Sequence, residues 1–275
     1  IRSCRTLGLK TLAVYSEVDQ RAKHVTEADD SRAIGPAPAK ESYLVFEKVL
    51  EAAKDAGADA VHPGYGFLAE NADFARAVLD AGLTWVGPRP ETITDMGDKE
   101  RARMLAQSAG VPIVPGSPRF DADDNEGLEA SGTEIGFPLL VKATAGGGGI
   151  GMKRVDTLKN LRETVEATEN MAEKAFGDGT VYLEKLIERP RHIEIQIFGF
   201  GDGRAVHYFE RECSIQRRFQ KIIEESPAPD LLTETRDSMA RAALALAKAE
   251  CYQGAGTIEF IVAPDGNFYF LEMNT

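Results

Sequence analysis

Short apolar runs and amphipathic segments alternate over residues 1–90. Residues 11–15 and 83–86 are continuous apolar runs of the kind that form buried strands, and residues 59–62 form a third, shorter strand. Between them, residues 42–56 and 71–81 repeat apolar side chains at helical spacing. Strands that alternate with helices predict a parallel sheet covered on both faces, with ligands at the loops that follow the strands.

The rest of the chain has a different pattern, in which strands follow one another directly. The runs FPLLVKA (137–143) and MKRV (152–155) are strand-like and enclose a glycine-rich segment. Further expected elements are helices at 99–110, 156–175 and 233–249, strands at 181–186, 192–198 and 205–209, and a hairpin of 255–262 with 267–273. This half is therefore predicted to contain antiparallel sheets, and residues 118–125 are the best candidate for a flexible connection.

Composition narrows the classes of function. The chain has 32 basic and 44 acidic residues and a net charge of −12, which argues against general nucleic-acid binding because phosphate backbones repel it. No apolar run approaches the roughly 20 residues that a membrane span needs, so no membrane association is expected. The cysteines Cys4, Cys213 and Cys251 are far apart and odd in number, which favours a reducing compartment over a disulfide framework.

A run of glycines separates the two strand-like segments. Gly146, Gly148 and Gly151 fit the GxGxxG spacing of dinucleotide-binding loops, but that motif requires a following helix, whereas MKRV is strand-like. Met152 stands where a Walker loop requires lysine. Consecutive glycines can present backbone N–H groups to an anion, and four of them are costly in entropy for an ordinary hairpin tip. The loop is therefore predicted to bind phosphate.

Charged residues near this loop and in the last strands could complete such a site. Lys142 ends the strand before the glycines and Lys99 begins a helix, so both could neutralise phosphates or could be solvated charges. Glu259 lies in the apolar run TIEFIV, and Glu272 and Asn274 share one face of FYFLEMN. Carboxylates in apolar strands are costly unless they are paired or bind metal. They therefore indicate a Mg²⁺ site, or else an edge strand that faces water.

Six longer strings make the sequence resemble the biotin carboxylases, which are part of the ATP-grasp superfamily. They are HPGYGFLAEN (62–71), MGDK (96–99), FPLLVKATAGGGGIGM (137–152), VYLEKLIERPRHIEIQI (181–197), ERECSIQRRFQKIIEESPAP (210–229) and GAGTIEF with FYFLEMNT (254–275). The resemblance implies an α/β, Rossmann-like N-terminal domain followed by an α+β ATP-grasp domain with a small glycine-loop lid. It places these domains at residues 1–97 and 98–275, with the lid at about 114–186 and the central catalytic part at 187–275.

The resemblance also assigns roles to individual residues. Lys221, which lies in a basic island with Arg217 and Arg218, would hold bicarbonate as the catalytic residue, unless the island is only a surface cluster of charges. Tyr65 would lie on the biotin side. The Mg²⁺ or Mn²⁺ ligands would be Glu259, Glu272 and Asn274. The ATP-binding residues would be Lys99, Lys142, Gly148, Gly149, Glu184, Lys185, Ile187, His192, Gln216, Glu259 and Glu272.

Three features depart from the family pattern. Phe219 stands where many members have histidine, which puts one nucleotide contact in doubt, and Ile150 stands where a basic residue is common. The lid is therefore expected to hold phosphate through backbone N–H groups with one cation fewer. The family pattern also begins earlier and continues after EMNT with a catalytic Arg and a general-base Glu. The chain is accordingly expected to be truncated at both ends and inactive by itself.

The implied reaction has two steps, because bicarbonate first attacks the γ-phosphorus of ATP and the resulting carboxyphosphate then delivers CO₂ to biotin. Biotin would arrive on a carrier domain or protein, and a carboxyltransferase would pass the carboxyl group to an acceptor that the sequence does not identify. A homodimer or larger complex is expected, in the bacterial cytoplasm or the mitochondrial matrix. The alternatives are another ATP-grasp ligase, acting on an amino acid or a purine precursor, and a non-catalytic nucleotide-binding module.

Overall fold

The N-terminal apolar runs form two short pairs of parallel strands. The computed structural model describes residues 1–121, 126–144, 151–217 and 220–275. In it β1 (Leu12–Ser16) pairs with β2 (Asp30–Gly35), and β3 (Ala60–Val61) pairs with β4 (Thr84–Trp85), both parallel as expected. The accompanying helices are α1 (Arg2–Thr6), α2 (Lys23–Glu27), α3 (Phe46–Asp55) and α4 (Ala72–Asp80), with 3-10 turns at Glu17–Asp19, Ala39–Glu41 and Phe67–Glu70.

The expected helix at 71–81 shows how the sequence fixes this region. Asn71 precedes α4 and its side chain accepts a hydrogen bond of 2.8 Å from the Phe74 N–H, which satisfies one free donor of the first turn. Phe74 is buried and meets Trp85 of β4 edge to face, with ring centroids 5.5 Å apart. This contact ties the helix to the second strand pair.

Two consecutive helices lead from this region to the rest of the chain. They are α5 (Pro90–Gly97), which the hydrophobic pattern did not predict, and α6 (Lys99–Ser108). The Asp98 carboxylate accepts hydrogen bonds from the Glu100 and Arg101 N–H groups and so begins α6 at Lys99. Ala102 and Ala106 pack into the core of the C-terminal sheet, which fixes α6 on that part of the molecule.

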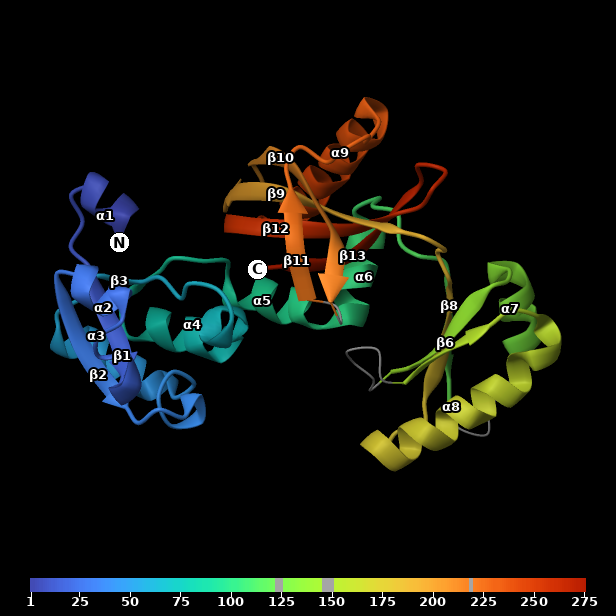
Figure 1. The fold of residues 1–275 in the computed structure, drawn as a ribbon, viewed down its shortest axis with the longest axis horizontal. Helices are drawn as coiled ribbons and strands as arrows, with labels where there is room; N and C mark the ends of the chain where they lie inside the picture. Colours follow the sequence, from blue (N-terminus) through green and yellow to red (C-terminus); the bar gives the residue numbers. More distant parts are fainter. Residues whose placement is uncertain (122–125, 145–150, 218–219) are drawn as a thin grey trace.

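Residues 116–185 form a unit with its own sheet and its own hydrophobic cluster (Figure 1, green and yellow, right). Its elements are β5 (Gly116–Phe120), α7 (Leu128–Ile135), β6 (Leu139–Ala143), β7 (Met152–Val155), the 3-10 turn Leu158–Asn160, α8 (Leu161–Phe176) and β8 (Val181–Lys185). The strand order is β5-β8-β6-β7, and all pairs are antiparallel.

The prediction of a flexible connection at 118–125 is wrong for residues 118–120. These residues lie in β5, where Arg119 is paired with Tyr182 and Phe120 with Val181 of β8. The segment GSPRF has a proline and only one buried side chain, Phe120, so its hydrophobic pattern gives no strand signal. Its strand conformation comes from pairing with β8, a contact between distant parts of the chain.

The C-terminal part is a five-stranded antiparallel sheet with one long helix against it (Figure 1). In the order β11-β10-β9-β12-β13, its strands are β11 (Gln220–Glu225), β10 (Ala205–Arg217), β9 (Arg191–Phe200), β12 (Gln253–Val262) and β13 (Phe268–Asn274). Ile193, Ile195 and Ile197 of β9 are fully buried against α9 (Thr233–Ala249), whose Met239 and Leu246 belong to the same core. The alternate side chains of β9 therefore lie on the other face of the sheet.

Two expectations about the whole chain can be compared with the described residues. Within that part, no helix combines the length and the apolar character that a bilayer crossing would require. Cys4, Cys213 and Cys251 are all free thiols, in agreement with the expectation that they form no disulfide framework.

Candidate active site

Three glutamates form a row across the face of the five-stranded sheet opposite α9. Glu259 of β12 is paired with Glu194 of β9 on one side and with Glu272 of β13 on the other. Glu194 and Glu259 are only 3% and 2% exposed. Because like charges in paired strand positions repel and buried carboxylates are costly, the row requires cations around it.

Two basic side chains supply much of this compensation. The Arg211 Nε donates to Glu194 Oε1 at 2.5 Å, and the Lys221 Nζ donates to Glu194 Oε2 at 2.5 Å and to Glu259 Oε1 at 2.6 Å. Burial alone would lower the pKa of Lys221, but the hydrogen bonds to the two glutamates outweigh it and raise that pKa. Among the described residues these two carboxylates are the acceptors of Lys221, and since an ammonium group has three donors, one N–H is available to a further anion.

The Glu259 carboxylate has two further partners, His192 at Oε2 and Asn274 at Oε1. His192 Nε2 lies 2.6 Å from Glu259 Oε2, and the Asn274 side-chain amide donates to Oε1. Burial would raise the pKa of Glu259, but hydrogen bonds from His192 and Lys221 outweigh it and lower the pKa to about 2. Glu259 is therefore ionised at any physiological pH.

His192 is held in place by Gln216. The Gln216 Nε2 lies 2.7 Å from His192 Nδ1 and donates to the Cys213 carbonyl oxygen at 2.8 Å. The amide N–H can only donate, so Nδ1 is the accepting nitrogen of the ring and Nε2, which lies beside Glu259, carries the proton. This arrangement fixes the tautomer of His192.

Glu272 differs from the other two glutamates of the row. Among the described residues its carboxylate has no hydrogen bond or ion pair, and burial, followed by the charge of Glu259, raises its pKa. Two adjacent carboxylates and the Asn274 side chain offer the hard oxygen ligands that Mg²⁺ or Mn²⁺ takes. A carboxylate that is destabilised by burial and by a like charge fits a cation site, because a bound cation would favour its ionised form.

A second charged cluster lies on the 116–185 unit. The Lys142 Nζ donates to Glu184 Oε1 at 2.9 Å and lies 5.4 Å from the centre of the Tyr182 ring. Burial would lower the pKa of Lys142, but the Glu184 charge outweighs it and the pKa is raised. Lys185, by contrast, donates to the carbonyl oxygens of Gly136 and Phe137, so its ammonium is bound to the backbone after α7.

Comparison with known proteins decides the family. Residues 1–93 match the family described as "Biotin carboxylase, N-terminal domain", and residues 98–275 match the one described as "Carbamoyl-phosphate synthase L chain, ATP binding domain". The chain belongs to the biotin carboxylase family. This is a family of ATP-dependent ligases, and the resemblance drawn from the sequence is confirmed.

Individual relatives of the biotin carboxylase family agree over the whole chain. The biotin carboxylase of Halalkalibacterium halodurans is 48% identical over 275 residues, which are 100% of this chain and 61% of that protein. The mitochondrial methylcrotonoyl-CoA carboxylase subunit alpha of Dictyostelium discoideum is also 48% identical, with 39% of its length covered.

A solved structure gives the same result. It is the biotin carboxylase domain dimer of Hydrogenobacter thermophilus 2-oxoglutarate carboxylase in complex with MgADP, ADP and bicarbonate. Its TM-score is 0.83 at 45% identity, with 100% of this chain and 60% of that chain covered. The chain thus spans about 60% of the length of the bacterial relatives that it matches.

The structure brings most of the described residues that the sequence singled out for a biotin carboxylase site into two groups. One group lies together on the polar face of the five-stranded sheet: His192, Gln216, Lys221, Glu259, Glu272 and Asn274. Lys142 and Glu184 meet on the 116–185 unit. Tyr65 is 96% exposed on the N-terminal part and belongs to neither group. Gly148, Gly149, Ile150, Arg218 and Phe219 lie outside the described residues.

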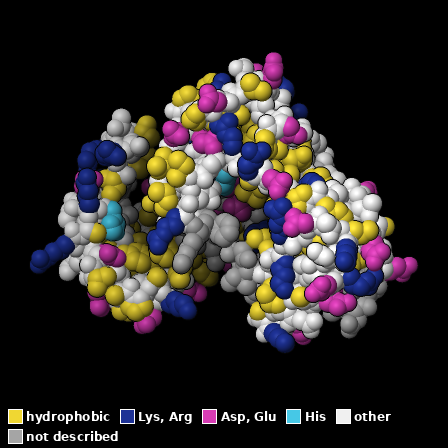
Figure 2. All heavy atoms as spheres, turned by 45° about the vertical axis from the view of Figure 1, so that its right-hand side comes forward, with side chains coloured by type: hydrophobic (Ala, Val, Ile, Leu, Met, Phe, Trp, Pro, Cys, Tyr) yellow, Lys and Arg dark blue, Asp and Glu magenta, His cyan; other side chains and the backbone are white. Residues whose placement is uncertain are grey.

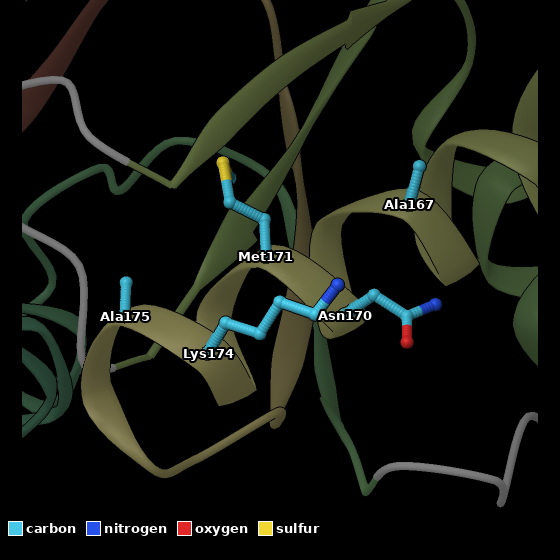
Figure 3. Close-up of a pocket in the computed structure, with 5 residues that line it drawn as sticks. All are labelled: Ala167, Asn170, Met171, Lys174 and Ala175. Atoms are coloured by element: carbon cyan, nitrogen blue, oxygen red, sulfur yellow. The ribbon is translucent and has the colours of Figure 1, made fainter.

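The surface of the molecule has one hollow that is bordered by charged side chains and a separate one on α8. Figure 2 shows acidic, basic and histidine side chains gathered around a hollow between the upper part of the molecule and the right-hand lobe. A separate hollow of about 460 Å³ is lined, within the described part of the chain, by residues of α8, and Figure 3 shows Asn170, Met171 and Lys174 among them. It shares no residue with the carboxylate row, so it is not the candidate active site.

The sequence did not point to Glu194, Arg211 or Arg103. Glu194 lies in the string HIEIQI, in which the alternation that places His192 opposite the isoleucines also places Glu194 there. That signal was available for Glu194. No sequence signal marked Arg211 or Arg103, because an arginine in a long strand or a polar helix resembles an ordinary surface charge.

Proposed function

We propose that the whole protein is the biotin carboxylase component of a biotin-dependent carboxylase, and that this chain carries its nucleotide, metal and bicarbonate sites. The observation that carries the proposal is the position of Lys221, whose ammonium joins Glu194 and Glu259 and retains one N–H donor. A small anion beside that donor would lie next to the carboxylate row. The complex of the H. thermophilus relative with MgADP and bicarbonate supports the same ligands here.

ATP would bind between residues 137–187 and the β12–β13 hairpin. Lys142 and Lys99 would offer positive charge to its phosphates, and the backbone N–H groups of Gly148 and Gly149 would close over them. The segment from Glu184 to Ile187 would line the adenine. Because the Lys185 ammonium already binds carbonyl oxygens after α7, this residue would contribute through its backbone.

Glu259, Glu272 and Asn274 would hold Mg²⁺ or Mn²⁺. When bound, the ion would neutralise charge on the phosphates of the nucleotide. The protein side of this site is already set, because His192 and Lys221 keep Glu259 ionised and Gln216 keeps His192 in one tautomer. Fixed charges of this kind need no reorganisation during the reaction.

In the proposed reaction an oxygen of bicarbonate forms a bond to the γ-phosphorus of ATP. The bond from that phosphorus to the oxygen of ADP breaks, and ADP leaves with the electron pair. The carboxyphosphate that results breaks down to CO₂ and phosphate, the phosphate accepts the ureido proton of biotin, and the nitrogen that loses this proton forms a bond to CO₂. Lys221 would position the bicarbonate by a charged hydrogen bond, and the lid would exclude water from the labile intermediate.

The remaining partners follow from this assignment. Biotin would be bound to a carrier domain or protein and would approach on the side of Tyr65, whose ring is free to make contact. A carboxyltransferase subunit or domain would receive the carboxyl group, and the protein would form a homodimer or larger complex. Its location would be the bacterial cytoplasm, or the mitochondrial matrix in a eukaryote.

A structure of the full-length protein with MgADP and bicarbonate tests this proposal. The expected result is nucleotide between residues 137–187 and 254–275, with a small anion within hydrogen-bond distance of the Lys221 Nζ. Nucleotide bound elsewhere, for example against the loop at 57–66, would contradict it.

A further inference from the structure

The 116–185 unit is joined to the rest of the chain by two segments that run side by side. The chain enters the unit through residues 114–117 and leaves it through residues 183–186, and three contacts link these two segments. The Lys185 N–H donates to the Pro115 carbonyl oxygen at 2.8 Å, the Leu183 N–H donates to the Ser117 hydroxyl at 2.9 Å, and Gly116 is paired with Glu184. Any rotation of the unit must therefore occur at this pair of segments, which we call the hinge.

One arginine from outside the unit bonds to both segments of the hinge. The Arg103 Nη2 donates to the Val114 carbonyl oxygen at 3.0 Å, and its Nη1 donates to Glu184 Oε2 at 2.7 Å. Arg103 belongs to α6, which is fixed on the C-terminal core by Ala102 and Ala106. The guanidinium thus connects the entry and the exit of the unit to the body of the molecule.

The packing around this guanidinium is close. A Cβ atom at Gly116 would lie 3.3 Å from the Arg103 Nη2 and 3.0 Å from the Leu183 carbonyl oxygen, so a side chain at position 116 would require these neighbours to shift by a few tenths of an ångström. The Arg103 and Glu184 side chains are 25% and 13% exposed, so the ion pair is partly shielded from water. A planar fork with separate donors suits two acceptors at fixed positions, whereas a lysine can satisfy only one of them well.

The same glutamate connects the hinge to the proposed nucleotide site. Glu184 Oε2 accepts from Arg103 and Oε1 accepts from Lys142, so one carboxylate lies between two cations. Without Arg103, Glu184 would be neutralised by Lys142 alone, and the Lys142 ammonium would be less available to a phosphate. Arg103 therefore influences a phosphate-binding lysine that it does not touch.

We propose that Arg103 is a positioning residue, which clamps both segments of the hinge, orients Glu184 and thereby sets how tightly nucleotide is bound. This inference rests on the proposed function for its effect on nucleotide, but its effect on the hinge does not. A second ion pair between α6 and the unit, Glu100 with Arg119, is solvent-exposed on both sides and supports the same attachment weakly.

The test uses the full-length protein with Arg103→Met, Arg103→Lys and the matched control Arg101→Met. Arg101 lies on the same helix and has a comparable ion pair, to Asp95 of α5 at 3.0 Å, but it does not reach the hinge. The measurements are hydrogen exchange at the Leu183 and Lys185 amides without nucleotide, the MgADP dissociation constant, and KM for ATP against kcat.

For Arg103→Met we expect exchange at both amides to be faster by about tenfold, and the MgADP dissociation constant and KM for ATP to rise by about tenfold. The kcat should change by less than about twofold, since the residue acts on binding and not on the transition state. Arg103→Lys keeps the charge but one bond at most, so it should fall between Arg103→Met and the wild type. Arg101→Met should match the wild type.

Three outcomes would overturn the inference. They are exchange at both amides equal to that of Arg101→Met, unchanged nucleotide affinity despite faster exchange, and a loss confined to kcat. If Arg103→Met does not fold, full recovery of wild-type exchange and affinity in Arg103→Lys would also overturn it, because charge alone would then suffice. Absence of nucleotide binding in the wild type would contradict the proposed function instead, while the exchange data would still decide whether Arg103 clamps the hinge.

Discussion

Glu259 and Glu272 are directly paired across β12 and β13, yet the pKa values of their carboxyl groups are shifted in opposite directions. His192 and Lys221 hold the pKa of Glu259 near 2, whereas burial and the charge of Glu259 raise the pKa of Glu272. The protein therefore neutralises the charge of Glu259 with its own His192 and Lys221, whereas the charge of Glu272 would be neutralised by a bound ligand. A metal ion shared with a nucleotide would do this.

Replacement of Glu272 separates stability from binding. Glu272→Gln removes a partly buried charge beside Glu259, so the free energy of unfolding measured without metal or nucleotide should rise. The same change removes a metal ligand, so the MgADP dissociation constant should rise by at least about tenfold. Urea unfolding and calorimetric titration of the full-length protein measure the two effects. Glu166→Gln on the exposed face of α8 should change neither, and a loss of stability in Glu272→Gln would contradict the account.

The low pKa of Glu259 predicts a dependence of stability on pH. A carboxyl group whose pKa falls from 4.5 unfolded to about 2 folded stabilises the native state fully above pH 4.5. This contribution, about 3 kcal/mol, should be lost progressively as the pH falls from about 4.5 toward 2. Urea unfolding between pH 6 and pH 2.5 should therefore show a steeper loss of stability in the wild type than in Glu259→Gln. Equal slopes for the two proteins would show that Glu259 is not held ionised by its partners.

Much of the site could be predicted because its residues lie on regular strands. The two-residue period placed His192 opposite Ile193, Ile195 and Ile197, and it placed Glu272 and Asn274 on one face of β13. The structure bears out both placements. What the sequence could not show is the register between strands, which brings Glu194 beside Glu259. Register depends on contacts between residues far apart in the chain.

The strands β2 and β11, which the hydrophobic pattern did not predict, share a physical cause. β11 is largely exposed and its string QKIIEE has no two-residue alternation, and in β2 only Ile34 is buried. Strands of this kind are stabilised by their hydrogen-bonded neighbours and not by an apolar face of their own. Lys221 lies on β11, whose hydrophobic pattern gives little indication of a strand. Its role toward bicarbonate could therefore be inferred only from the resemblance to the family.

Glu194, which the sequence did not indicate, should matter for bicarbonate. It accepts hydrogen bonds from both Lys221 and Arg211, and Glu194→Gln keeps the shape of the side chain while removing its charge. Lys221 would then be held by Glu259 alone, so KM for bicarbonate should rise by about tenfold, and KM for ATP should rise less. Steady-state kinetics of the full-length protein check this, with the exposed Glu225→Gln on β11 as the control. An equal rise in both KM values would indicate general damage to the sheet.

The most direct measurement of the central claim is the release of ADP from ATP by the full-length protein as bicarbonate is varied, with the wild type, Lys221→Met and Lys248→Met compared. Lys248 is an exposed lysine of α9 and serves as the control for loss of charge. The account predicts bicarbonate-dependent ADP release in the wild type and in Lys248→Met. In Lys221→Met that dependence should weaken by at least about tenfold, while MgADP affinity changes much less. Unchanged bicarbonate dependence in Lys221→Met, with nucleotide affinity lost, would contradict the account.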